Sequence, residues 1–264
     1  MTPELPPPPP PRPDATGSAP EGLLPVVWGA WQALGVFLIG NLLLGQIVAG
    51  SVVLAVMGVS PGGPVEGLPE IAASVAADIV FLVAMLGWLT WRSGDWRRRV
   101  GVFLGSRGLR DASVGFGLGL LLYVVVAYGV GIPLLALFRA LFGSQVSPPE
   151  QIPGHLSTNA KLLTVVLALV LAPVTEELFY RGILYRGVRD RHGVGLGVLA
   201  SALLFGASHL VAAPWRDALF LQTIMVFTGA GLALIYERRA NLVADIAAHM
   251  AFNVIGILFI FGSR

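Results

Sequence analysis

The chain has 264 residues, a mean hydropathy of +0.78 and only 12% charged residues. Soluble domains carry about 25% charged residues, so this composition excludes a water-soluble protein and predicts an integral membrane protein. The chain has no cysteine, which excludes disulfides, thiolate nucleophiles and cysteine-based zinc sites. Its net charge of +2 comes from basic residues spread between apolar runs, unlike the basic surface patch of a nucleic-acid-binding domain.

The first 21 residues are polar and contain six consecutive prolines, Pro6 to Pro11. Proline lacks the backbone donor that helices need. We therefore expect residues 1–21 to be an extended, solvated tail in the cytoplasm, followed by a membrane domain at 22–264.

Apolar runs of about 20 residues predict membrane-spanning helices. The first run, Leu23–Val59, is too long for one span and barely long enough for two, so we predict one long helix, with a hairpin as the alternative. Six further spans are predicted: Ile71–Trp91, Ala112–Phe138, Leu162–Arg186, Val194–Val211, Ala218–Tyr236 and Leu242–Phe261. The predicted fold is an all-α transmembrane helix bundle of about seven spans, seven or eight.

The positions of the basic residues predict the orientation. With the N-terminus in the cytoplasm, 13 of the 17 basic residues fall in cytoplasmic segments. The four on the outer side are Arg139, Lys161, Arg216 and Arg264. Cytoplasmic loops carry an excess of Arg and Lys, so we expect a multi-pass protein of the cell membrane with a cytoplasmic N-terminus.

Few ionisable residues lie within the predicted spans, and such residues are costly in a bilayer and usually functional. Glu177 and Arg181 share one helix face at i,i+4, and we expect them to form an internal ion pair. Glu176 is rotated by about 100° from that face. An additional carboxylate beside a neutralised pair has no structural purpose in lipid, so we predict a functional role for Glu176.

Two histidines are also predicted at membrane depth. Phe205 and His209 share a helix face, and so do His249 and Asn253. Asp245, one turn before His249, could orient its ring or cap the helix start. The helical rise places Glu176 and His209 about 22 Å, and His249 about 15 Å, from the Arg-rich side. These residues could meet in one cavity that opens toward that side.

Asp78 is the remaining ionisable residue within a predicted span. It has no evident partner in the sequence, and a pair with Arg181 across the bundle is one candidate. The sequence alone does not decide this pairing.

A carboxylate, two imidazoles and an amide suit hydrolysis by an activated water. Glu176, His209 and His249 could also hold a divalent metal such as zinc, and the sequence does not separate these alternatives. A dyad of Ser208 and His249, as in a rhomboid-like serine protease, is a weaker alternative. It leaves the glutamate pair and Asn253 unexplained.

The three motifs resemble, in order, those of the CAAX protease and bacteriocin-processing family (CPBP, also called Abi), which includes the type II CAAX prenyl endopeptidases. The motifs are Glu176-Glu177-x-x-x-Arg181, Phe205-x-x-x-His209 and His249-x-x-x-Asn253, and the resemblance covers about residues 160–255. Asp245 departs from the family pattern, in which proline is frequent at that position.

The resemblance implies an intramembrane endopeptidase that acts on a protein or peptide substrate, lipidated or not. Glu176 would activate the water and His209 would assist it, while His249 and Asn253 would stabilise the oxyanion. No cofactor is required by this reading, and a zinc-dependent form stays open.

Three alternatives lack proteolysis: a membrane scaffold of the same fold, a bacteriocin self-immunity protein, and a proton-coupled transporter, since membrane carboxylates also relay protons. The absence of a visible internal repeat disfavours the transporter. The Arg-rich, Lys-poor composition suggests a bacterial protein.

Overall fold

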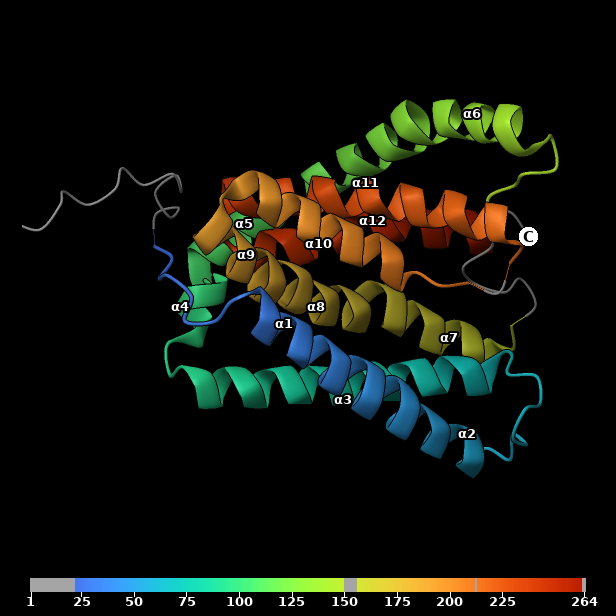
Figure 1. The fold of residues 1–264 in the computed structure, drawn as a ribbon, viewed down its shortest axis with the longest axis horizontal. Coiled ribbons are helices and arrows are strands. Elements are labelled where there is room, and N and C mark those ends of the chain that lie inside the picture. The colour runs from blue at the N-terminus through green and yellow to red at the C-terminus, as the bar shows by residue number, and fades with distance from the viewer. Residues whose placement is uncertain (1–21, 150–155, 212, 263–264) are drawn as a thin grey trace, which may run out of the picture.

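The structure is a computed structural model that describes residues 22–149, 156–211 and 213–262, with side chains described up to residue 258. The tail predicted for residues 1–21 lies outside the described residues. Helices dominate the described part of the chain, which contains no strand (Figure 1). This all-helical architecture confirms the predicted fold class.

Seven long helical segments run back and forth along the bundle (Figure 1). The first segment consists of α1 (Ala30–Val36), the π-helical stretch η1 (Phe37–Gly50) and α2 (Ser51–Val56), and the second is α3 (Leu68–Arg92). The short α4 (Trp96–Val100) follows. The third segment consists of α5 (Gly105–Val124), the π-helical η2 (Val125–Gly131) and α6 (Ile132–Phe142). The fourth consists of α7 (Thr158–Val166), η3 (Leu167–Leu171), α8 (Ala172–Glu177), η4 (Leu178–Tyr185) and α9 (Arg186–His192). The last three are α10 (Val194–Ser208), α11 (Trp215–Arg239) and α12 (Leu242–Gly262).

The first apolar run forms one continuous helix, Ala30–Val56, so the hairpin alternative is wrong and the described residues contain seven segments. Five of them are long and apolar enough to cross a membrane. The apolar helices Val194–Ser208 and Leu242–Leu258 are shorter. The protein is therefore a multi-pass membrane protein, as its composition predicts.

The Arg-rich turns gather at one end of the bundle, where α4 and α9 both lie (Figure 1). The segment before α1 crosses this end and is held by packing and hydrogen bonds. Trp28 is fully buried, and its indole N–H donates to the Ile183 carbonyl at 3.0 Å. The Val26 N–H donates to the Asp190 carboxylate at 3.0 Å. Packed chain therefore fills the Arg-rich end.

Helices α5 and α12 approach closely because α5 presents glycine at the contact. A Cβ at Gly115 would overlap the backbone of Ala244, and a Cβ at Gly119 would overlap that of Ala248. Small residues allow such backbone approach between membrane helices. Gly117, which lies between them, would place its Cβ in open space.

We expect Gly119→Val to destabilise the bundle by about 1–3 kcal/mol, since overpacking at a tight contact has that effect. Gly117→Val introduces the same side chain into open space and should be close to neutral. Unfolding by sodium dodecyl sulfate in mixed micelles measures both variants. Equal stabilities would contradict the close contact between α5 and α12.

Candidate active site

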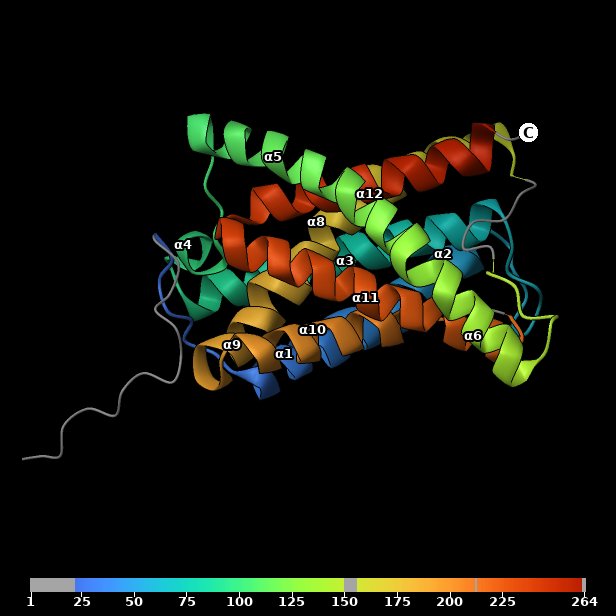
Figure 2. The same cartoon turned by 90° about the horizontal axis from the view of Figure 1, so that it is seen from above.

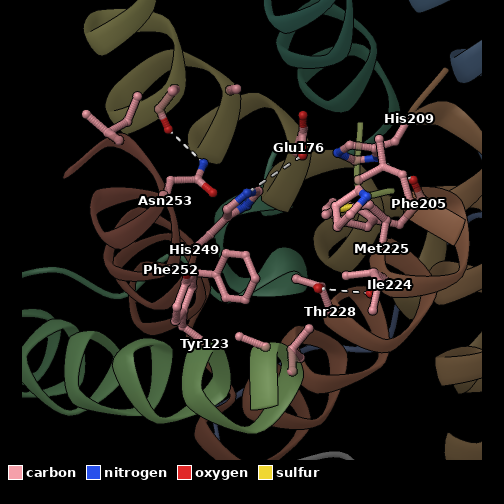
Figure 3. Close-up of a pocket in the computed structure, with 18 of the residues that line it drawn as sticks. Tyr123, Glu176, Phe205, His209, Ile224, Met225, Thr228, His249, Phe252 and Asn253 are labelled. Atoms are coloured by element: carbon pink, nitrogen blue, oxygen red, sulfur yellow. Dashed lines mark hydrogen bonds and ion pairs between the residues drawn. The ribbon is translucent and has the colours of Figure 1, made fainter. Parts of the chain in front are cut away.

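A cavity of about 450 Å³ lies among η3, α8, α10, α11, α12 and the α5–η2 segment. Glu176, His209, His249 and Asn253 all line it, with Phe205 beside them (Figure 3). The structure thus brings side chains from three separate sequence motifs to one cavity.

The cavity extends away from the Arg-rich end. Along the fourth segment its lining begins at Leu167 and ends at Glu176, and along α12 it begins at His249 and ends at Ile257. The fourth segment runs toward the Arg-rich end and α12 runs away from it (Figure 1), so these residues lie on the Arg-poor side. The expected opening toward the Arg-rich side is wrong, because packed chain occupies that end.

The two adjacent glutamates have different surroundings. Glu177 is fully buried, and its Oε1 accepts a hydrogen bond from Arg181 Nη1 at 2.9 Å, which confirms the predicted ion pair. Glu176 is 27% exposed, and its Oε2 lies 3.9 Å from His249 Nε2. Consecutive helical residues point about 100° apart, so one carboxylate stabilises the interior while the other faces the cavity.

Arg181 neutralises charge within the bundle. Its guanidinium is fully buried, donates to the Gly229 carbonyl at 3.0 Å, and lies 3.7 Å from the Asp245 carboxylate through Nε. Although we counted Arg181 among the cytoplasmic residues, it belongs to this buried network. A buried guanidinium between two carboxylates lowers the cost of holding all three in a water-poor interior.

From the sequence, Asp245 was a candidate to orient the His249 ring or to cap the helix start, and the structure shows a different role. Its carboxylate is paired with Arg181. The helix start is capped by Asn241, whose Oδ1 accepts a hydrogen bond from the Val243 N–H at 3.1 Å. The sequence could not place Asp245, because its partner lies on another helix.

The ring of His249 is oriented by Glu177. Nδ1 lies 2.7 Å from Glu177 Oε1. An ionised carboxylate only accepts hydrogen bonds, so Nδ1 carries the proton and Nε2 is left for the cavity. His249 is thereby held between the structural glutamate and the cavity-facing one.

The side chains of His209 and Asn253 are each held by one hydrogen bond to a backbone carbonyl. His209 Nδ1 donates to the Phe205 carbonyl at 2.7 Å, which leaves Nε2 free of this bond. Asn253 donates to the Ala168 carbonyl at 2.8 Å, and a second amide hydrogen remains.

The ring of Phe205 packs against both His209 and His249. Its ring centroid lies 4.6 Å from that of His209 and 6.0 Å from that of His249, and the Arg181 guanidinium lies over its ring at 4.8 Å. Phe205 therefore supports both imidazoles and covers the buried cation.

The proposed metal ligands are not arranged as a ligand set. Within the described ranges, no three His, Asp or Glu side chains are grouped to bind one ion. His249 uses Nδ1 for Glu177, which leaves a single nitrogen toward Glu176. A metal-binding histidine also uses one ring nitrogen for the ion while the other bonds to a carboxylate, so the orientation of His249 suits either form of the site.

Ser208 is turned toward Tyr180. Its Oγ accepts from the Tyr180 hydroxyl at 2.7 Å and donates to the Phe205 carbonyl at 2.9 Å. The predicted alternative of a dyad with His249 is not supported, because both bonds of this hydroxyl go elsewhere.

Asp78 lies on α3 close enough to Glu176 for the two carboxylates to repel each other. The ion pairs of Arg181 go to Glu177 and Asp245 instead, so the suggested pair of Asp78 with Arg181 is wrong. The sequence analysis did not assign Asp78 to the site, although its position inside an apolar run was the available signal.

Comparison with known proteins identifies the part of the chain that carries the site. Residues 158–255 match the family model described as type II CAAX prenyl endopeptidase Rce1-like. This match confirms the resemblance of the three motifs. An Escherichia coli protein described as an uncharacterized 24.3 kDa protein is 28% identical over 153 residues, covering 57% of this chain and 66% of its own length. That coverage is just under two thirds of the relative. No solved structure matches.

Proposed function

Since residues 158–255 match the family model described as type II CAAX prenyl endopeptidase Rce1-like, we propose that this chain is an intramembrane endopeptidase with Glu176 as its general base. One observation carries the proposal. Of the two adjacent glutamates, Glu176 faces the cavity and Glu177 is taken by Arg181 and His249. The cavity therefore receives a carboxylate without a guanidinium partner.

In the proposed reaction, Glu176 accepts a proton from a water molecule while the water oxygen bonds to the substrate carbonyl carbon. The same proton then passes from Glu176 to the amide nitrogen as the carbon–nitrogen bond breaks. His209 positions the water through Nε2. The remaining amide hydrogen of Asn253 donates to the oxyanion, as preorganised donors do in acyl transfer.

His249 assists at the oxyanion when its Nε2 carries a proton. The Glu177 carboxylate at Nδ1 then stabilises the imidazolium, as the carboxylate of a Ser–His–Asp triad does. This assigns the buried Glu177 a positioning role behind the reacting groups.

We also propose that the Arg-rich end lies in the cytoplasm, in accordance with the positive-inside rule. The cavity would then extend toward the outer side of the membrane. This orientation favours the processing of a membrane-bound peptide or protein over cleavage of a lipidated cytoplasmic tail.

The function is tested by sequencing new N-termini in membranes of cells that produce the chain or its Glu176→Gln variant. The proposal expects a set of cleavage products that depends on Glu176. Identical products from both forms would contradict proteolysis by this site.

We expect the purified protein in liposomes to cleave such a site equally well before and after treatment with 1,10-phenanthroline, since the reaction above uses no metal. A large loss of activity that added zinc restores would show instead that a metal takes part.

A further inference from the structure

Two helices that border the cavity separate from each other within the membrane. Helix α5 contacts α12 closely at Gly119, against the backbone of Ala248. One turn further, the rings of Tyr123 and Phe252 meet edge to face at 5.3 Å. Beyond this pair, η2 packs on α11 while the later part of α12 packs on η3, so the helices diverge (Figure 2).

The cavity lies in the angle between the diverging helices. Its two walls there are formed by Val126 and Ala127 of η2 and by Asn253, Gly256 and Ile257 of α12. A Cβ at Gly256 would meet nothing within 4 Å, so this wall borders open space. Pro148 and Pro149 line the cavity at the Arg-poor end. The cavity is therefore bounded by the Arg-poor end of the bundle and, laterally, by the angle between η2 and α12.

The ionisable groups of the cavity gather on one side of it. Glu176, His209, His249 and Asn253 lie on one side of it, while Thr228 and Tyr123 lie on the other, and the rest of the lining is apolar (Figure 3). Backbone polar groups without partners are costly at membrane depth. Polar side chains of a substrate would lack partners in this lining, whereas a segment with apolar side chains and a helical backbone would need partners only where its scissile peptide bond reaches the polar groups.

The outer surfaces of both helices suit contact with lipid. Val124, Val125 and Tyr128 are at least half exposed near the angle, and Leu258 is 65% exposed on α12. Large apolar side chains exposed on membrane helices face the hydrocarbon of the bilayer. The angle thus joins the cavity to a lipid-facing surface.

We propose that the angle between η2 and the later part of α12 is a lateral entrance through which an apolar, membrane-embedded peptide segment reaches Glu176. The proposal rests on the proposed proteolytic function and specifies its substrate class. The substrate enters from the bilayer, and its scissile bond stops where the polar groups begin.

The entrance itself is tested without any activity measurement. Because the chain has no cysteine, a single nitroxide label can be attached to Gly256→Cys in liposomes. Val83→Cys, on an exposed apolar face of α3, provides the lipid reference, and Gly94→Cys, in the turn before α4, provides the water reference. Collision rates with oxygen and with a water-soluble nickel complex are compared. A Gly256 label that behaves like the Val83 label supports the entrance, and one that behaves like the Gly94 label overturns it.

The use of the entrance is tested with a matched pair of tryptophan variants. A Cβ at Gly256 or at Gly87 meets nothing within 4 Å, so a side chain can start from either position without overlap, but only Gly256 borders the angle. The probe is a quenched fluorescent peptide that contains a cleavage site found by N-terminal sequencing, joined to an apolar segment of about 20 residues.

We expect Gly256→Trp to lower cleavage of this probe at least about tenfold, because a segment obstructed at the entrance cannot place its scissile bond at Glu176 and small misplacements have effects of that size or more, and Gly87→Trp to leave it unchanged. Equal rates for both variants would overturn the entrance. If the unmodified protein cleaves no probe at all, the proposed function fails, and the nitroxide comparison still decides whether the angle opens to lipid.

Discussion

Glu176→Gln should abolish proteolysis while the protein still inserts and folds. Loss of a general base lowers rates by about 10²–10⁴-fold, and glutamine keeps the size of the side chain. The carboxylate is 27% exposed in the cavity, and its Oε2 has no hydrogen-bond partner among the described residues. Its replacement therefore removes no hydrogen bond of that atom, and His249 lies 3.9 Å from it. Initial rates on a cleavable peptide in liposomes measure the effect.

Ser208→Ala is the matched control for this prediction. Its hydroxyl bonds to Tyr180 and to the Phe205 carbonyl, so we expect full or nearly full activity. An inactive Ser208→Ala together with an active Glu176→Gln would support the serine-protease alternative. A cellular phenotype that Glu176→Gln rescues completely would support a non-catalytic scaffold or immunity protein.

Arg181→Met should destabilise the bundle strongly. The fully buried guanidinium pairs with Glu177 and Asp245, which are also fully buried. Removing one partner of a buried ion pair costs about 3–5 kcal/mol, because a charge is left without compensation. Unfolding in mixed micelles, with circular dichroism as the signal, measures the loss.

An exposed arginine provides the comparison. Arg110→Met changes the same side chain at an exposed position near the start of α5, where substitutions usually stay within about 0.5 kcal/mol. Adding Glu177→Gln to Arg181→Met removes one uncompensated carboxylate and should restore part of the stability. Equal stability of the two single variants would show that Arg181 does not neutralise the interior.

Features that depend on one helix were predictable from the sequence. The Glu177–Arg181 pair follows from i,i+4 spacing, and the different direction of Glu176 follows from the helical rotation of its neighbour. Both are observed, because local helix geometry is nearly independent of what surrounds it. The number of helical segments was predictable to within one, and the continuous helix Ala30–Val56 gives seven among the described residues, five of them long and apolar enough to cross a membrane.

Among features that depend on several helices, the cavity shared by Glu176, His209 and His249 was expected, but the partners of the charged side chains were predicted poorly. Asp245 turned out to pair with Arg181, and Asp78 lies near Glu176. Distances along a helix led to an expected opening toward the Arg-rich side, and the lining extends the other way. That side is determined by the segment around Trp28, which fills the Arg-rich end, and by the glycines that hold α5 against α12.

The sequence by itself determined that this protein lies in a membrane, which residues carry its scarce charges, and which of those share a helix face. These properties follow from composition and from the fixed period of the α-helix. Only the tertiary structure decided that Glu177 orients His249, that Glu176 is left facing a cavity, and that this cavity extends toward the Arg-poor side. The physical reason is that these relations arise where separate helices pack against one another, and the fit between helices is a property of the assembled bundle.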